Sequence, residues 1–265
     1  MSRAAAIGIF DSGVGGLTVV QALIETLPAE HLIYLGDTGR YPYGTKSAET
    51  VTRYSLENTE FLLARDVKLL VVACNSASSV ALGAIAARAG VPVVGVIEPG
   101  ARAALARSRT RRIGVIGTDA TIGAGEYTRA LRAGDPAVEV YTRACPLFVP
   151  LAEEGWTDGA VVQQVAETYL GTLARSGIDT LILGCTHYPL LKQPIASVLG
   201  PGVTLVDSAE ETARDVHALL TARDLLRVGG RGSTSFFVTD VPERFVRIGE
   251  RFLGARVQSA VRIER

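Results

Sequence analysis

The sequence has few cysteines, and it has no excess of positive charge. Its three cysteines, Cys74, Cys145 and Cys185, are an odd number without a CxxC pair, which argues against a disulfide framework and a four-ligand zinc site. Lys plus Arg and Asp plus Glu number 27 each, so the chain lacks the basic excess typical of proteins that bind nucleic acid or membrane surfaces. We therefore expect no bound metal and no nucleic-acid partner, and the thiols remain free for chemistry.

Long apolar runs are also missing. The most apolar stretches, such as Leu69–Cys74, are far shorter than the roughly 18 residues that a membrane-crossing helix needs. The apolar start Ala4–Phe10 leads into Asp11 and a glycine cluster, and it lacks the cleavage pattern of a signal peptide. These features predict a cytoplasmic protein that does not bind membranes.

Lysine is scarce as well, since only Lys46, Lys68 and Lys192 are present. A pyridoxal phosphate enzyme needs a lysine to form its Schiff base. Lys46 stands in a loop rich in Tyr, Pro and Gly without the partners that this chemistry requires, so we interpret it as an exposed residue.

The chain does contain a regular alternation of short apolar runs with longer helical patterns. This alternation predicts βα units and parallel sheets that are covered on both faces. Strands are expected at Ala5–Phe10, His31–Leu35, Leu69–Ala73, Val93–Val96, Arg112–Ile116, Val138–Tyr141, Thr180–Leu183, Thr204–Val206 and Phe236–Thr239. Helices are expected at Leu17–Leu27, Ser47–Arg65, Ala77–Ala89, Gly100–Arg107, Gly125–Ala133, Gly159–Ser176, Glu210–Leu220 and Pro242–Leu253.

A weak internal repeat accompanies this alternation. Asp11 and Cys74 are 63 residues apart, and Thr118 and Cys185 are 67 apart, each pair following similar apolar runs. Two related halves would explain the spacing, although any α/β chain can repeat at such intervals.

We expect two pseudo-symmetric parallel-sheet α/β domains that face each other across an active-site cleft. Residues 1–97 plus 208–265 would form the domain that carries Cys74, and residues 98–207 the domain that carries Cys185. The chain would cross between them at Glu98-Pro99 and again near Asp207.

Cys74 and Cys185 each follow a predicted strand, at the sheet edge where open α/β folds bind ligands. Small polar residues come next and suggest a helix start, whose partial positive charge would lower the pKa of the thiol. A single buried cysteine is usually inert core. Two cysteines at equivalent strand ends favour a chemical role for both.

Two opposed thiols suit one reaction in particular. Racemisation at a carbon centre needs a base on one face to remove the proton and an acid on the other face to return one. A thiolate and a thiol, one from each half of a pseudo-symmetric protein, meet this need and exchange states at each turnover. Cys145, which precedes Pro146, is interpreted as structural.

The chain resembles the glutamate racemases of the aspartate/glutamate racemase superfamily nearly from end to end. The matching segments are Gly8–Leu17, Tyr34–Thr38, Tyr41–Gly44, Ala73–Ala77, Gly95–Pro99, Cys145–Leu147, Val149–Leu151, Gly184–Pro189, Val206–Ser208 and Asp240–Gly254. The family pattern more often has Thr where this chain has Ser76. Because a hydroxyl is kept, we expect little change in function.

The resemblance implies roles for individual residues. Cys74 and Cys185 would be the catalytic acid/base pair, Asp11 and His187 would assist proton handling beside them, and Glu153 and Asp37 would tune the thiols or the substrate ammonium. The residues implied to contact the amino acid are Asp11, Ser12, Tyr43, Gly44, Asn75, Ser76, Thr186 and His187, with Thr118 and Thr121 as weaker candidates. The resemblance further implies no cofactor, a homodimer, and production of D-glutamate for peptidoglycan.

Other interpretations of the motifs are weaker. The glycine loop 13–16 departs from the dinucleotide pattern, because Thr18 stands where that pattern has Gly or Ala. Cys185 and His187 lack further zinc-ligand spacing. Three functional alternatives stay open: an aspartate racemase, a cysteine hydrolase that uses Cys185 and His187, and a non-catalytic amino-acid-binding module.

Overall fold

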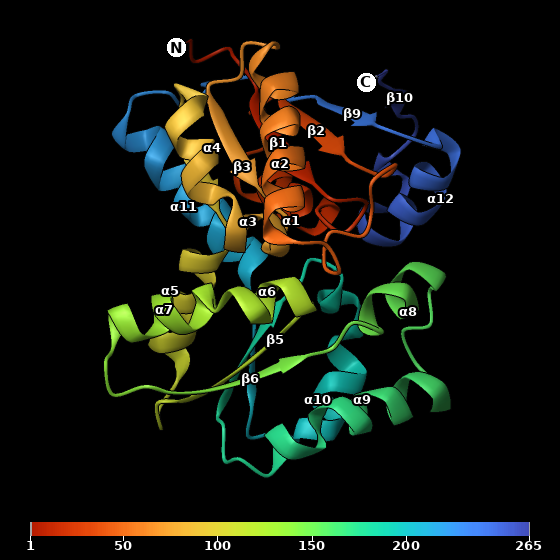
Figure 1. The fold of residues 1–265 in the computed structure, drawn as a ribbon. Helices are drawn as coiled ribbons and strands as arrows, with labels where there is room; N and C mark the ends of the chain where they lie inside the picture. The colour runs from red at the N-terminus through yellow and green to blue at the C-terminus, as the bar shows by residue number, and fades with distance from the viewer. Residues whose placement is uncertain (1, 265) are drawn as a thin grey trace.

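The chain forms two parallel β-sheets covered by helices, which lie one above the other in Figure 1. The computed structural model describes residues 2–264. The first sheet has the strand order β10-β9-β2-β1-β3-β4. Its strands are β1 (Ile7–Asp11), β2 (Leu32–Gly36), β3 (Leu69–Val72), β4 (Val93–Gly95), β9 (Thr234–Val238) and β10 (Val261–Arg262). The second sheet has the order β6-β5-β7-β8. Its strands are β5 (Arg112–Gly117), β6 (Glu139–Ala144), β7 (Thr180–Gly184) and β8 (Thr204–Asp207).

Helices fill the connections between these strands. They are α1 (Leu17–Thr26), α2 (Ala48–Leu63), α3 (Asn75–Val80), α4 (Leu82–Ala89), α5 (Ile97–Arg107), α6 (Asp119–Ala124), α7 (Glu126–Gly134), α8 (Phe148–Glu154), α9 (Ala160–Ala174), α10 (Lys192–Leu199), α11 (Ser208–Ala222) and α12 (Pro242–Leu253), with 3-10 turns η1 (Tyr188–Leu191) and η2 (Gly254–Arg256). Among residues 2–264, no helix is long and apolar enough to cross a membrane.

The two sheets share one strand order. β2-β1-β3-β4 in the first sheet corresponds to β6-β5-β7-β8 in the second, and every strand pair is parallel. β3 and β7, which precede the two cysteines of interest, occupy the same place in this order. The expected two parallel-sheet α/β architecture is confirmed, and its strand order agrees with the weak repeat in the sequence.

Continuous apolar strands explain why both sheets are sandwiched between helices. All five residues of β1 and all five of β7 are buried, as parallel strands with helices on both faces require. One cluster of buried side chains runs from Ile9 of the first sheet, through Leu17 and Ala213 of the helices, to Val115 of the second. The two halves therefore meet through a shared apolar core.

The nine predicted strands are all present within a few residues, but several details differ. The helix expected at Ala77–Ala89 is divided into α3 and α4, which meet at Ala81. The helix expected at Gly100–Arg107 begins earlier, because Glu98 and Pro99 occupy the first turn of α5, where proline is tolerated. Asp207 caps the start of α11 by accepting a hydrogen bond from the Ala209 N–H at 3.0 Å.

Four elements were not expected from the sequence. They are β10, α6, α8 and α10. Three of them have eight residues or fewer, and β10 has only two, so none spans enough residues to show a periodic pattern. Two of these unexpected helices, α6 and α8, contribute to the site described next.

Candidate functional site

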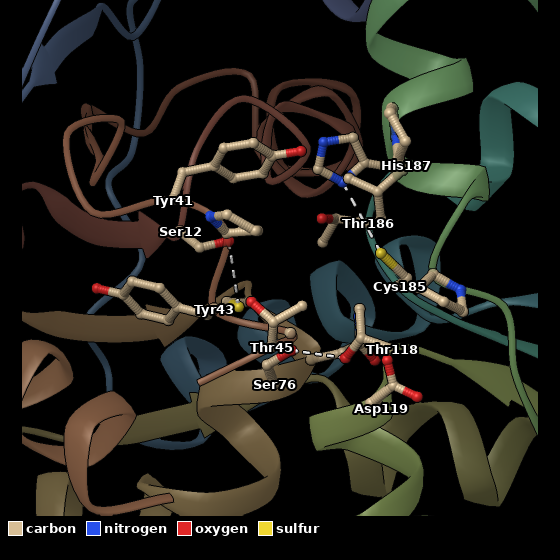
Figure 2. Close-up of a pocket in the computed structure, with 17 residues that line it drawn as sticks. Ser12, Tyr41, Tyr43, Thr45, Ser76, Thr118, Asp119, Cys185, Thr186 and His187 are labelled. Atoms are coloured by element: carbon tan, nitrogen blue, oxygen red, sulfur yellow. Dashed lines mark hydrogen bonds between the residues drawn. The ribbon is translucent and has the colours of Figure 1, made fainter. Parts of the chain in front are cut away.

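A cavity of ≈ 90 Å³ lies where the carboxyl ends of the two sheets meet. Figure 2 shows most of its lining side chains pointing toward one another from both halves of the chain. The lining residues are Ser12, Tyr41, Pro42, Tyr43, Gly44, Thr45, Cys74, Asn75, Ser76, Thr118, Asp119, Pro146, Val149, Pro150, Cys185, Thr186 and His187. Seven of the eight residues predicted to contact an amino acid are in this set. The eighth, Asp11, lies fully buried outside the lining.

Cys74 enters the cavity from the end of β3. It precedes the first turn of α3, and only 4% of it is exposed. Its Sγ donates a hydrogen bond to the Ser12 Oγ at 3.6 Å. Burial raises the pKa of the Cys74 thiol to about 12, and the charge of Asp11 adds to this shift. The expected lowering of this pKa by the helix start is therefore wrong, because desolvation outweighs the backbone N–H groups.

Cys185 enters from the end of β7, across the cavity from Ser12 in Figure 2. Its Sγ lies 3.8 Å from the His187 Nδ1. The helix start expected directly after Cys185 is only a 3-10 turn that begins at Tyr188. The positive charge near Cys185 comes from His187.

His187 is held between Cys185 and Glu153. Its Nε2 lies 3.0 Å from the Glu153 Oε1, and both residues are buried. Burial by itself lowers the pKa of His187, but the hydrogen bonds with Cys185 and Glu153 outweigh this and raise it to about 10. The imidazole is therefore protonated near neutral pH, and it places a cation beside the Cys185 sulfur.

Glu153 is itself held by residues that follow two strands of the first sheet, β2 and β9. The Tyr41 hydroxyl hydrogen-bonds with its carboxylate. From α12, Arg244 lies 3.5 Å from the Glu153 Oε2, and Arg251 donates to the Glu153 carbonyl. These contacts across the two halves fix the carboxylate that supports His187. Tyr41 and Arg244 were not among the predicted site residues, although Tyr41 stands in the quoted Tyr41–Gly44 motif.

Hydroxyl groups line the side of the cavity where the two halves touch. The Ser76 Oγ lies 2.9 Å from the Thr118 Oγ1 and 3.4 Å from the Thr121 Oγ1. Thr118 also caps α6 by accepting a hydrogen bond from the Thr121 N–H. The weaker candidates Thr118 and Thr121 therefore belong to the cluster around Ser76, as Figure 2 shows for Thr118.

Asp37 acts on the cavity through another side chain, that of Tyr43. Its carboxylate accepts hydrogen bonds from Tyr43, Arg40 and Thr239, and it does not line the cavity. It fixes the Tyr43 side chain, which does line the cavity, and nothing in the structure brings it to either thiol.

The glycine loop after β1 allows a close approach between the halves. A Cβ added at Gly15 would lie 2.4 Å from the Thr186 Oγ1 and 2.5 Å from the His187 ring. A Cβ at Gly44 would similarly lie 2.7 Å from Thr118. These glycines provide room for His187, Thr186 and Thr118.

Two buried polar atoms near the cavity have no hydrogen-bond partner. They are the Asp11 Oδ1 and the Asn75 Nδ2. Buried polar atoms are nearly always paired, so such atoms beside a cavity indicate where a ligand binds. Burial also raises the pKa of Asp11, against the opposing effect of His187.

Candidate ligands for a metal or for pyridoxal phosphate do not converge at this site. Within residues 2–264, no group of three His, Cys, Asp or Glu side chains is placed to hold a metal ion. Lys46 is half-buried, in contrast to the expected exposure, and it does not line the cavity.

Residues 7–216 match the family model described as Asp/Glu/hydantoin racemase. The chain belongs to the Asp/Glu/hydantoin racemase family. A curated glutamate racemase of Geobacter metallireducens is 60% identical over 253 residues, which are 95% of this chain and 94% of that protein. A glutamate racemase of Syntrophus aciditrophicus is 49% identical over 97% of this chain and 96% of its own length.

Solved structures of the racemase family have the same fold. The glutamate racemase isoform RacE1 of Bacillus anthracis matches with a TM-score of 0.96 and 42% identity over 99% of this chain and 98% of that one. The Francisella tularensis glutamate racemase in complex with D-glutamate matches with a TM-score of 0.94 and 38% identity over the same shares. The two-sheet architecture is therefore that of the racemase family.

Proposed function

We propose that this protein interconverts L-glutamate and D-glutamate by proton transfer between two cysteines. The observation that carries the proposal is the pair of buried thiols at the ends of corresponding strands, β3 and β7, both lining one cavity. The relatives named glutamate racemase, one of them solved with D-glutamate, support the choice of substrate.

The two thiols differ in a way that suits opposite roles. Burial and Asp11 keep Cys74 protonated, whereas the Cys185 sulfur lies 3.8 Å from the Nδ1 of the protonated His187. Cys185 as thiolate removes the Cα proton and forms its own S–H bond. Cys74 then gives its thiol proton to the opposite face of the planar Cα. The other enantiomer reacts with the two roles exchanged.

The rest of the cavity suits a dicarboxylate. Of its described lining residues none is Lys or Arg, so carboxylates would be held by hydroxyl, amide and backbone donors and by the His187 cation. We propose Ser12, Tyr43, Gly44, Asn75, Ser76, Thr186 and His187 for this task, with Asp11 behind Cys74. Fixed donors around the cavity would also stabilise the developing charge.

Proton exchange in D₂O tests the proposal directly. Purified protein freed of cofactors is incubated separately with D- and L-glutamate, while NMR follows the Cα proton and circular dichroism follows optical activity. We expect deuterium at Cα and convergence of both enantiomers on an equal mixture, with aspartate reacting more slowly. Absence of exchange with both amino acids in folded protein would rule the proposal out. Faster reaction of aspartate would make this an aspartate racemase.

Replacing Glu153 with Gln tests the support of His187. The Glu153 carboxylate helps to raise the pKa of His187 to about 10, and the imidazolium is lost as the pH rises through that value. Without the charge of the Glu153 carboxylate the pKa of His187 falls, so activity should decline at a lower pH. We expect the alkaline limb of kcat/KM to move down by about one pH unit, with little change at neutral pH, where the imidazole stays protonated.

Glu154→Gln is the matched control, because Glu154 is the exposed neighbour on the same helix. It should keep the pH profile of the unmodified protein. If Glu153→Gln has that same profile, Glu153 does not set the charge of His187.

Several further points rest on the resemblance to the family. We propose that the domains comprise residues 1–97 plus 208–265 and residues 98–207, that the protein is a cytoplasmic homodimer without a cofactor, and that its D-glutamate enters peptidoglycan. The grouping of β9 and β10 with the first sheet supports the domain division.

A further inference from the structure

The amide of Asn75 presents an unpaired donor at the cavity. Asn75 follows Cys74, lines the cavity and is only 3% exposed. Its Nδ2 has no hydrogen-bond partner, whereas its Oδ1 accepts a hydrogen bond from the Tyr127 hydroxyl at 2.7 Å. One end of the amide is therefore fixed by the protein, and the other is left for a ligand.

Tyr127 reaches this amide from α7, which follows the strand β5 of the second sheet. It lies near the start of α7 and is only 2% exposed. Its ring packs closely against two glycines: a Cβ at Gly184 would lie 3.0 Å from the ring, and a Cβ at Gly100 would lie 3.4 Å from it. Since Gly184 directly precedes Cys185, Tyr127 connects the residue after one proposed catalytic cysteine with the residue before the other.

A third residue completes the chain of hydrogen bonds. The Ser208 hydroxyl, which is buried at the start of α11, hydrogen-bonds with the Tyr127 oxygen. With Ser208 as its donor, the phenol has its own proton available for the Asn75 Oδ1. This order of donors leaves the Asn75 NH₂ group on the side of the amide away from Tyr127, in a residue that lines the cavity.

We propose that Tyr127 is a positioning residue that fixes the Asn75 amide so that its Nδ2 donates to a carboxylate of the substrate. This inference rests on the proposed function, because the substrate is taken to be a dicarboxylate. A carboxylate can only accept hydrogen bonds, so an amide that turned its oxygen toward it would repel it. Tyr127 excludes that orientation, since its hydroxyl proton occupies the amide oxygen.

The variant Tyr127→Phe tests the inference, because it keeps the ring between the two glycines and removes only the hydroxyl. The Asn75 oxygen is then buried without a donor, and the orientation of the amide is no longer fixed. We expect KM for both enantiomers to rise about tenfold while kcat stays within about twofold, as for loss of binding shared by substrate and transition state.

A double-variant cycle separates this role from a merely structural one. In an Asn75→Ala background, adding Tyr127→Phe should leave KM unchanged, because the amide to be positioned is absent. Tyr169→Phe is the matched control: its hydroxyl, which accepts a hydrogen bond from the Leu147 N–H, lies outside the cavity, and KM should be unchanged. An unchanged KM in Tyr127→Phe, or an equal rise in both backgrounds, would overturn the inference.

Asn75→Asp gives an independent test if Tyr127→Phe does not fold. It can still accept from Tyr127, but it presents an oxygen to the cavity in place of the donor. We expect KM to rise at least a hundredfold, whereas an unchanged KM would show that the cavity side needs no donor. Racemisation by the unmodified protein is measured alongside. If the unmodified protein does not racemise glutamate, the result counts against the proposed function. If it does, but the variants keep the KM of the unmodified protein, the result counts against the role of Tyr127 alone.

Discussion

Replacing either Cys74 or Cys185 with Ala should reduce racemisation by at least about a thousandfold, since each variant lacks the acid or the base for one face of Cα. The remaining thiol can still exchange the Cα proton of the enantiomer whose proton points toward it. We therefore expect residual deuterium exchange in D₂O to be confined to one enantiomer in Cys74→Ala and to the other in Cys185→Ala. NMR at Cα with each pure enantiomer measures both effects.

Cys145→Ala is the matched control for these two variants. Cys145 is also buried, but its Sγ contacts the Arg143 carbonyl and it does not line the cavity. Its replacement should leave kcat/KM within about twofold of the unmodified protein. Racemisation that survives Cys74→Ala while Cys185→Ala abolishes it would contradict the two-thiol mechanism and favour a reaction that uses Cys185 with His187.

Gly15→Ala should lower kcat about a hundredfold, although position 15 carries no chemistry. Its Cβ would lie 2.5 Å from the His187 ring, about 1 Å short of ordinary contact. His187 is held by Cys185 on one side and Glu153 on the other, so it cannot yield without losing one of these contacts. Displacements of about 1 Å at a reacting group can cost about a hundredfold in rate.

Gly83→Ala provides the comparison for this variant, because a Cβ at Gly83 in α4 would meet no atom within 4 Å. It should retain full activity and gain slightly in stability, since alanine favours a helix. Thermal unfolding of both proteins shows whether Gly15→Ala remains folded. If folded Gly15→Ala has an activity within twofold of that of the unmodified protein, catalysis does not require His187 at its observed position.

The local apolar pattern of the sequence was sufficient to predict the sheets. Continuous apolar runs such as Leu69–Val72 and Thr180–Gly184 can be buried only as central parallel strands, so all nine predicted strands are present. Their polar successors, Cys74 and Cys185, then had to lie at the carboxyl edges. The elements that the sequence did not indicate are short, and two of them, α6 and α8, carry Thr121 and Glu153.

The charge state of the thiols could not be inferred in this way. Residues after a strand suggested a helix start that would lower the pKa of Cys74, whereas burial and Asp11 raise it. Desolvation depends on how much of the whole chain surrounds a group, and sequence neighbours do not report it. The same applies to His187, whose pKa depends on Glu153, 34 residues away along the chain.

The sequence by itself thus determined the parallel α/β architecture, the positions of Cys74 and Cys185 at strand ends, and the family motifs around them. Only the tertiary structure decided that Gly15 gives room to His187, that residues of α12 hold Glu153, and that Tyr127 fixes the Asn75 amide. The physical reason is that strand formation and burial follow from local apolar patterns. Contacts across the cavity depend on how distant segments pack against one another, and no local pattern encodes them.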